Sequence, residues 1–211
     1  MLAPPETSTV FALTRPMEFK RSVFFLVRHG QTELGAQGRW QGSKQDVGLT
    51  DLGRAEVAAL IPFLPALPVY CSPMKRTLET AEIISQALNV EMYRLGLLID
   101  ADIGDWGGQT MEESDKTMTS EIRLKQRTHQ LLDFPHGESI SSLEDRIIET
   151  IDRLDPPIIV VGHQLPLQLL VCKLTGIPID YARKLHIDEA SLTIIRHTKI
   201  EVLNFKNRRI E

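Results

Sequence analysis

Cysteine is scarce in this chain, and long hydrophobic runs are missing. The 211 residues include two cysteines, Cys71 and Cys172, which excludes a disulfide framework. Both stand in apolar surroundings, so we interpret them as small buried hydrophobes. No apolar run approaches the roughly 18 residues of a membrane-spanning helix, and residues 1–21 lack the apolar core of a secretory signal. We therefore expect a cytoplasmic protein that does not contact a membrane.

An excess of charge of one sign is missing as well. The formal net charge of −4 and the pI of about 5.9 argue against general nucleic-acid binding. Metal-ligand motifs such as HExxH and CxxC are absent, so no metal and no cofactor are expected. Hydrophobic residues make up 42% of the chain and charged residues 25%, as in an ordinary globular domain. A domain of this size buries about 70% of the surface of its unfolded chain.

The chain divides into an N-terminal arm, residues 1–21, and a single domain, residues 22–211. Prolines punctuate the arm and predict loose order. Strand patterns cover residues 22–28, 69–71, 158–162, 191–197 and 200–205, with an edge strand within 91–104. Helix patterns cover residues 50–64, 72–88, 139–154 and 165–175, with polar helical structure over 111–132 and N-caps at Thr50, Ser72 and Ser139. Strands that alternate with helices predict an α/β sandwich with a largely parallel sheet.

Basic and imidazole side chains stand at three predicted strand ends. Arg28 and His29 follow the first buried strand, and His163 follows the second. Arg76 comes shortly after the strand that ends at Cys71. The carboxyl ends of parallel strands lie on one side of a sheet, where ligands bind. An arginine fork bonds two oxygens of a phosphate at once. The sequence therefore predicts a dianion pocket built from two arginines and two histidines.

Two histidines in such a pocket add a chemical function. Neutral imidazole is a good nucleophile near pH 7, so one histidine can attack phosphorus while the other groups hold the phosphoryl oxygens. The acidic segment 100–105 supplies candidates to protonate the leaving alcohol. The glycine-rich loop 30–50 carries Arg39 and Lys44, cations that can turn toward a ligand. Thr32 can accept hydrogen bonds from backbone N–H groups beyond the turn.

Several short motifs occur in a recognisable order: LVRHGQTE at 26–33, LTDLGR at 49–54, SPMKRT at 72–77, GDW at 104–106, HGES at 136–139 and VVGH at 160–163. With these motifs, residues 22–172 resemble the histidine phosphatase superfamily. The resemblance is to the phosphoglycerate mutase-like branch, which includes cofactor-dependent phosphoglycerate mutase and fructose-2,6-bisphosphatase. It implies an α/β three-layer sandwich in which a mixed, mostly parallel sheet lies between helices. A cap from the loop after Arg28 and the 100–136 region would set substrate specificity.

The resemblance also implies a role for each matching residue. His29 is the nucleophile that becomes phosphohistidine. Arg28 and Arg76 clamp the phosphoryl oxygens, and His163 bonds the phosphoryl group and stabilises the transition state. Asp100 stands at the position of the family's proton donor. The candidates for substrate binding are Thr32, Arg39 and Gln164.

Some positions depart from the family pattern. Asp100 replaces the usual glutamate and is one methylene shorter; Asp102 and Asp105 are alternative acids, but the spacing favours Asp100. Three further replacements are Gly35 for an asparagine that often bonds phosphate, Gly107 for a glutamate, and Gln164 for a glycine, with its backbone N–H retained. Each change would weaken catalysis by a few kcal/mol at most, the scale of one oxyanion donor.

Three functions remain open from the sequence. The first is metal-independent hydrolysis of a small phosphorylated metabolite, so that the partner is a small-molecule phosphate ester. The second is a phosphoglycerate-type mutase, although mutases carry a longer insert than residues 101–137 provide. The third is a phospho-ligand-binding protein that has lost efficient catalysis, as the departures suggest. Phe24, Phe25 and the last hairpin are candidates either for the core or for a homodimer interface.

The remaining polar residues and Trp106 have structural interpretations. Glu138 and Ser139 are expected to cap a helix, and Trp106 to belong to the core or a pocket wall. Asp188 and Glu189 are expected to close a turn before the last hairpin. The histidines expected on the surface, or as satisfied polar groups, are His129, His136, His186 and His197.

Overall fold

The computed structural model describes residues 22–207 of the chain. The predicted arm, residues 1–21, and residues 208–211 of the predicted domain lie outside the described residues. The described part forms a six-stranded sheet in the order β3-β2-β4-β1-β5-β6. The strands are β1 (Val23–Arg28), β2 (Val69–Cys71), β3 (Met92–Arg94), β4 (Ile158–Gly162), β5 (Leu192–Arg196) and β6 (Lys199–Phe205). Strands β3, β2, β4 and β1 are parallel, and β5 and β6 are antiparallel, as the mixed-sheet prediction requires.

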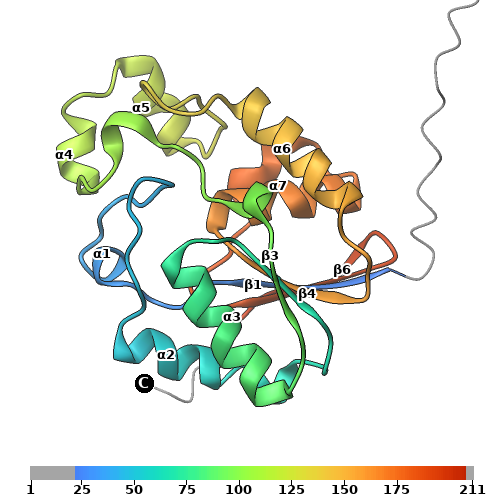
Figure 1. Ribbon diagram of the computed structural model, residues 1–211. Coiled ribbons are helices and arrows are strands. Elements are labelled where there is room, and N and C mark those ends of the chain that lie inside the picture. The colour runs from blue at the N-terminus through green and yellow to red at the C-terminus, as the bar shows by residue number, and fades with distance from the viewer. Residues whose placement is uncertain (1–21, 208–211) are drawn as a thin grey trace, which may run out of the picture.

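Helices cover both faces of this sheet. The α-helices are α1 (Glu33–Ala36), α2 (Asp51–Ala58), α3 (Lys75–Leu88), α4 (Met111–Asp115), α5 (Ser120–Arg127), α6 (Ile140–Asp152) and α7 (Gln164–Thr175). Short 3-10 turns are η2 (Ile61–Phe63), η3 (Gly96–Leu98), η4 (Gly104–Trp106) and η5 (Ile179–Lys184). Figure 1 shows α2 and α3 below the sheet and α6 and α7 above it. The predicted three-layer sandwich is confirmed.

The continuous apolar pattern of the central strands follows from burial on both faces. Along β1, Phe24 and Leu26 pack into the cluster that contains Ile147 of α6. Val27 points to the opposite cluster, which contains Val57 of α2. Successive side chains alternate between faces, so a strand covered on both sides needs apolar residues throughout. Each such side chain contributes about 1.5–3 kcal/mol on burial.

Three predicted helices differ from the observed ones. The first ends at Ala58 instead of near residue 64, because the ring of Pro62 in η2 blocks further α-helical hydrogen bonding. The second begins at Lys75 with Met74 as its N-cap, so the expected cap at Ser72 is wrong. The hydroxyl of Ser72 lies 2.8 Å from His163 Nε2. The predicted polar helix 111–132 is divided into α4 and α5. The predicted caps at Thr50 and Ser139 are confirmed.

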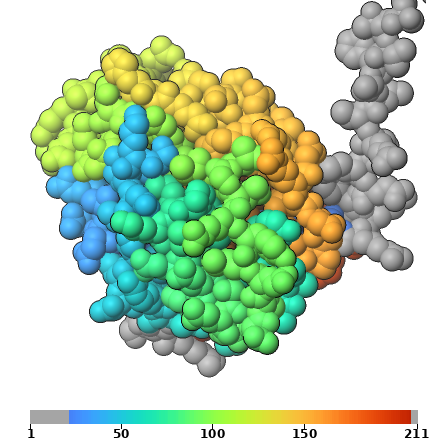
Figure 2. All heavy atoms as spheres, viewed as in Figure 1, coloured from blue at the N-terminus to red at the C-terminus, as the bar shows by residue number. Residues whose placement is uncertain are grey.

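Residues 107–135, which contain α4 and α5, form a cap beside the loop 30–50. The indole of Trp40 in this loop donates to Ser114 Oγ at 3.0 Å and packs against Trp106, with ring centroids 5.5 Å apart and the ring planes tilted by 37°. Trp106 is 1% exposed, so its predicted place in the core is confirmed. Figure 2 shows the cap in yellow-green meeting the blue loop on this face of the molecule. No helix within residues 22–207 has the length and apolar character needed to cross a bilayer.

Close backbone contact fixes the chain just after the first strand. Gly53 in α2 packs on Gln31, and a Cβ placed at Gly53 would lie 2.2 Å from the Gln31 carbonyl oxygen. Thr50 supports the same contact, since its backbone N–H donates to that oxygen at 2.9 Å. Helix α2 therefore holds the residues that follow His29 at a fixed distance.

Replacing Gly53 by alanine is expected to lower the free energy of unfolding by about 1–2 kcal/mol. The new methyl group forces α2 away from the Gln31 backbone, which costs about 1–3 kcal/mol. This cost outweighs the gain of up to about 1 kcal/mol in helix propensity. Gly96→Ala is the matched control, because a Cβ there meets nothing within 4 Å, and it should change stability by less than about 0.5 kcal/mol. Urea denaturation measures the stability of both variants. If Gly53→Ala is as stable as Gly96→Ala, Gly53 does not pack closely on Gln31.

Candidate active site

Parallel pairing of β1 with β4 brings the two predicted histidines together. Arg28 pairs with Gly162 in the register of the two strands, so the next residues, His29 and His163, leave the sheet side by side. The His29 N–H donates to the Gly162 carbonyl at 3.1 Å, and the two imidazole centroids lie 5.4 Å apart. The expectation that these strand ends converge is confirmed.

The hydrogen bond of His29 defines its tautomer. Nδ1 lies 2.8 Å from the Gly30 carbonyl oxygen, which can only accept, so Nδ1 carries the proton. The lone pair of the neutral ring is then on Nε2. Burial lowers the pKa of His29 well below its usual 6.5, and the charge of Arg28 lowers it further. The ring therefore stays neutral near pH 7, as a nucleophile requires.

Arg76 is completely buried, and its guanidinium group donates hydrogen bonds to an acid, an imidazole and two backbone carbonyl oxygens. Its Nη2 donates to Asp100 Oδ2 at 2.8 Å, and its Nε donates to His163 Nδ1 at 3.2 Å. Its other bonds go to the carbonyl oxygens of Gln45 at 2.7 Å and Gly42 at 3.3 Å. Because Nδ1 of His163 accepts, the proton of that ring is on Nε2, 2.8 Å from the hydroxyl oxygen of Ser72. Burial and the charge of Arg76 keep the pKa of His163 well below 6.5.

The three acids of segment 100–105 have different partners. Asp102 pairs with Lys44 at 2.9 Å, which lowers the pKa of Asp102. Asp105 lies 2.9 Å from His136 Nδ1. Asp100 is 9% exposed, accepts from the Ala101 N–H and lines the central cavity, which neither of the other two does. This placement supports the preference for Asp100 as the proton donor.

A cavity of about 620 Å³ opens beside His29. Five of the predicted site residues line it: Arg28, His29, Arg39, Asp100 and Gln164. Arg76, His163 and Thr32 have no exposed surface and are not among its lining residues. The hydroxyl of Thr32 accepts from the Gly35 N–H at 3.1 Å as the N-cap of α1, which confirms its predicted backbone hydrogen bond. Its binding of substrate stays a prediction.

Arg28 is the arginine that the cavity reaches at the end of β1. Its Nη1 donates to the Ile187 carbonyl at 2.8 Å, and its Nη2 lies 3.9 Å from Glu189 Oε1. Its Nε is buried without a hydrogen-bond partner among the described residues. An anion bound here would satisfy a donor that otherwise costs about 1–3 kcal/mol to bury. No group of three or more metal-ligating side chains occurs within residues 22–207.

Sequence reasoning missed part of the cavity wall. Residues that the sequence had placed on the surface or in a turn, or had not singled out, line it as well: Gln126, His129, Arg183, His186, Asp188, Glu189 and Lys206. They come from the cap, η5 and the segments around β5 and β6, far from the recognised motifs. No local pattern marks them, because only tertiary contacts bring them to the cavity. His136 is exposed, as expected, and the free cysteines are buried.

The two buried neutral histidines predict acid sensitivity. Below pH 6.5 the unfolded chain binds protons at positions 29 and 163 that the folded chain does not bind. The free energy of unfolding should therefore fall as the pH falls, by up to about 1.4 kcal/mol per pH unit for each histidine. His29→Gln should make this slope shallower by about one proton, and exposed His136→Gln should not. Urea denaturation between pH 7.5 and pH 5 measures the slopes; an unchanged slope in His29→Gln would overturn the assignment.

Comparisons with known proteins show which proteins this chain is similar to. Phosphoserine phosphatase 1 of Hydrogenobacter thermophilus is 29% identical over 178 residues, covering 81% of this chain and 84% of that protein. The 6-phosphofructo-2-kinase/fructose-2,6-bisphosphatase 1 of Homo sapiens is 31% identical over 173 residues, covering 79% of this chain but 35% of that protein. A mycobacterial glucosyl-3-phosphoglycerate phosphatase solved with VO3 shares the fold, with a TM-score of 0.75, 24% identity, and coverage of 87% of this chain and 98% of that chain.

The family model described as histidine phosphatase superfamily (branch 1) matches residues 24–204, from the first strand of the sheet to the last. The chain therefore belongs to branch 1 of the histidine phosphatase superfamily.

Proposed function

We propose that the protein hydrolyses small phosphate monoesters through a phosphohistidine at His29. The observation that carries this proposal is the tautomer of His29, whose lone pair is on Nε2 in a ring that lines the cavity. Arg28 and Asp100 share that wall. Family membership and a curated relative named phosphoserine phosphatase support the same reaction.

The reaction has two steps. In the first, the Nε2 lone pair of His29 forms a bond to phosphorus, the phosphorus–oxygen ester bond breaks, and Asp100, which starts this step as the neutral acid, gives its proton to the leaving alkoxide. In the second, Asp100 takes a proton from water, the oxygen of that water attacks phosphorus, and the phosphorus–nitrogen bond breaks. Inorganic phosphate leaves, and both residues return to their starting forms. Arg28 stabilises charge on the phosphoryl oxygens throughout.

The buried partners position these groups without lining the cavity. Arg76 holds Asp100 and His163 by hydrogen bonds, and the ring of His163 lies against that of His29. The positive charge of Arg76 also acts on the phosphoryl group through a region of low dielectric constant, where its effect is larger than in water. No metal is needed if these groups balance the phosphoryl charge.

Turnover of an aryl phosphate with a chelator present tests the proposal. His29→Ala should abolish turnover, and Asp100→Asn should reduce it by about 10²–10⁴-fold, with a larger loss for an ester whose alkyl leaving group needs the proton more. Asp102→Asn is the matched control and should retain activity, because Asp102 does not line the cavity. Full activity in His29→Ala would refute the mechanism. Tight phosphate-ester binding by the wild type without any turnover would favour a binding protein.

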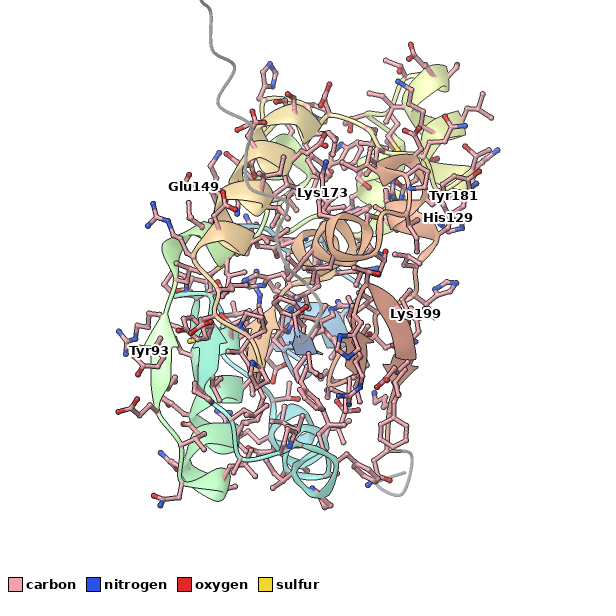
Figure 3. The ribbon with its side chains drawn as sticks, turned by 90° about the vertical axis from the view of Figure 1, so that its right-hand side faces the viewer. Tyr93, His129, Glu149, Lys173, Tyr181 and Lys199 are labelled. Atoms are coloured by element: carbon pink, nitrogen blue, oxygen red, sulfur yellow. The ribbon has the colours of Figure 1, made fainter. Side chains whose placement is uncertain are left out.

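The cap-side wall suggests which esters fit. Arg183 in η5 donates to the Gln130 carbonyl at 2.9 Å and to Gln126 Oε1 at 2.6 Å, which ties η5 to the end of α5. Figure 3 shows Tyr181 of η5 and His129 of the cap on the same side of the molecule. Among residues 22–207 no carboxylate forms an ion pair with Arg183, and burial lowers the pKa of its guanidinium. We propose that a second anionic group of the substrate, a carboxylate or phosphate, balances this charge.

Arg183→Gln is expected to raise the KM for phosphoserine by about 10–100-fold, the loss of one charge-assisted hydrogen bond. The KM for a neutral-tailed aryl phosphate should change little. Arg183→Lys keeps the positive charge, so its KM for phosphoserine should lie between those of the wild type and Arg183→Gln. Gln126→Leu removes the contact with α5 but keeps the charge, so it should preserve the preference for phosphoserine. Equal effects of Arg183→Gln on both esters would indicate that Arg183 only holds the cap.

A further inference from the structure

Glu189 lies at the phosphoryl end of the cavity although it is far from the recognised motifs. The backbone around it is bonded to the end of β1: the Ala190 N–H donates to the His29 carbonyl at 3.0 Å, and the Arg28 N–H donates to the Ser191 carbonyl at 3.3 Å. The side chain of Glu189 lines the cavity, with Oε1 3.9 Å from Arg28 Nη2. The fold therefore fixes this carboxyl group beside the residues that would hold the phosphoryl group.

The missing side chain at Gly35 makes room for this carboxyl group. A Cβ placed at Gly35 would lie 2.4 Å from Glu189 Oε1 and 3.2 Å from its Cδ. Gly35 belongs to α1, the helix that follows directly after the His29 turn and is capped by Thr32. The carboxyl group of Glu189 thus occupies the space between the end of β1 and α1, and any larger residue at position 35 would displace it.

Charged groups from several elements act on Glu189. These groups are Arg28 of β1, Arg76 of α3, Glu56 of α2 and Lys206, which follows β6. Glu56 and Lys206 form an ion pair at 2.7 Å, and Glu56 Oε2 is buried without a partner among the described residues. The neighbouring Asp188 is held by Asn204.

These surroundings favour the neutral carboxyl group more than water does. Burial raises the pKa of Glu189, Arg28 opposes this rise, and Glu56 adds to it. An ionised Glu189 would repel a phosphoryl dianion and compete for the charge of Arg28. A protonated Glu189 would do neither, and its hydroxyl would be a hydrogen-bond donor.

We propose that Glu189 binds the phosphoryl group as a neutral carboxylic acid, donating its hydroxyl to an oxygen that Arg28 also holds. This inference rests on the proposed function, since it concerns the same phosphoryl site. A proton from solvent enters with the dianion and leaves again when the product departs, so no net proton is consumed. Glu189 then makes anion binding stronger as the pH falls.

Sulfate is the suitable probe, because it stays a dianion between pH 5.5 and pH 8 and is not hydrolysed. Calorimetry of the full chain, in two buffers of different ionisation enthalpy, gives both the affinity and the number of protons taken up. In the wild type, the affinity for sulfate should fall about tenfold for each pH unit above the pKa of Glu189 in the free protein. Glu189→Gln donates through its amide at every pH, so it should bind sulfate more tightly than wild type at pH 8 and take up one proton fewer.

Two further variants keep the test decisive. Gly35→Ala pushes the carboxyl group away and should also remove the proton uptake, while exposed Glu201→Gln on β6 should match wild type. If Glu189→Gln keeps the wild-type pH dependence and proton uptake, the proposal is wrong. Sulfate binding is independent of turnover, so an inactive wild type that still shows the proton linkage would reject the proposed hydrolysis and leave the role of Glu189 intact.

Discussion

The rest of the site depends on the hydrogen bonds made by the buried guanidinium of Arg76. A charge with no exposed surface is tolerated when hydrogen bonds replace its contacts with water. Arg76 meets this condition through Asp100, His163 and two carbonyl oxygens of the loop 30–50. It therefore fixes an acid, an imidazole and a loop relative to one another. Removing one of these partners typically costs about 1–3 kcal/mol, because a buried donor or acceptor is left without a hydrogen bond.

The sheet supplies the second constraint. Parallel strands β1 and β4 deliver His29 and His163 to the same edge, and the antiparallel strand β5 brings the turn with Glu189 to that edge from the opposite direction. The mixed sheet is therefore part of the site, since a wholly parallel one would not place that turn there. The cap covers this edge from above, and Arg183 joins it to η5. One wall is thus built on strands, and the other consists of short helices.

The parts that could be predicted are those encoded locally. Apolar runs marked β1 and β4, and threonine and serine marked the helix starts at Thr50 and Ser139. His29 and His163, which follow these two strands, marked the edge of the sheet where the cavity lies. Glu189 and Arg183 could not be predicted, because strand pairing and cap docking bring them to the cavity from a distance. Ser72 misled for a related reason: its hydroxyl satisfies the buried ring of His163, a tertiary partner that replaced the local cap.

The proposed mechanism requires the phosphoryl group to pass through a covalent bond to His29. Rapid quenching of the full chain during hydrolysis of a labelled phosphate monoester, followed by denaturation in alkali and peptide mapping, detects this bond. A phosphorus–nitrogen bond survives alkali and breaks in acid, so up to one label per chain should be found on the peptide containing His29. Rapid turnover with no label on the protein, and with inversion of configuration at phosphorus, would show direct attack by water and contradict the account.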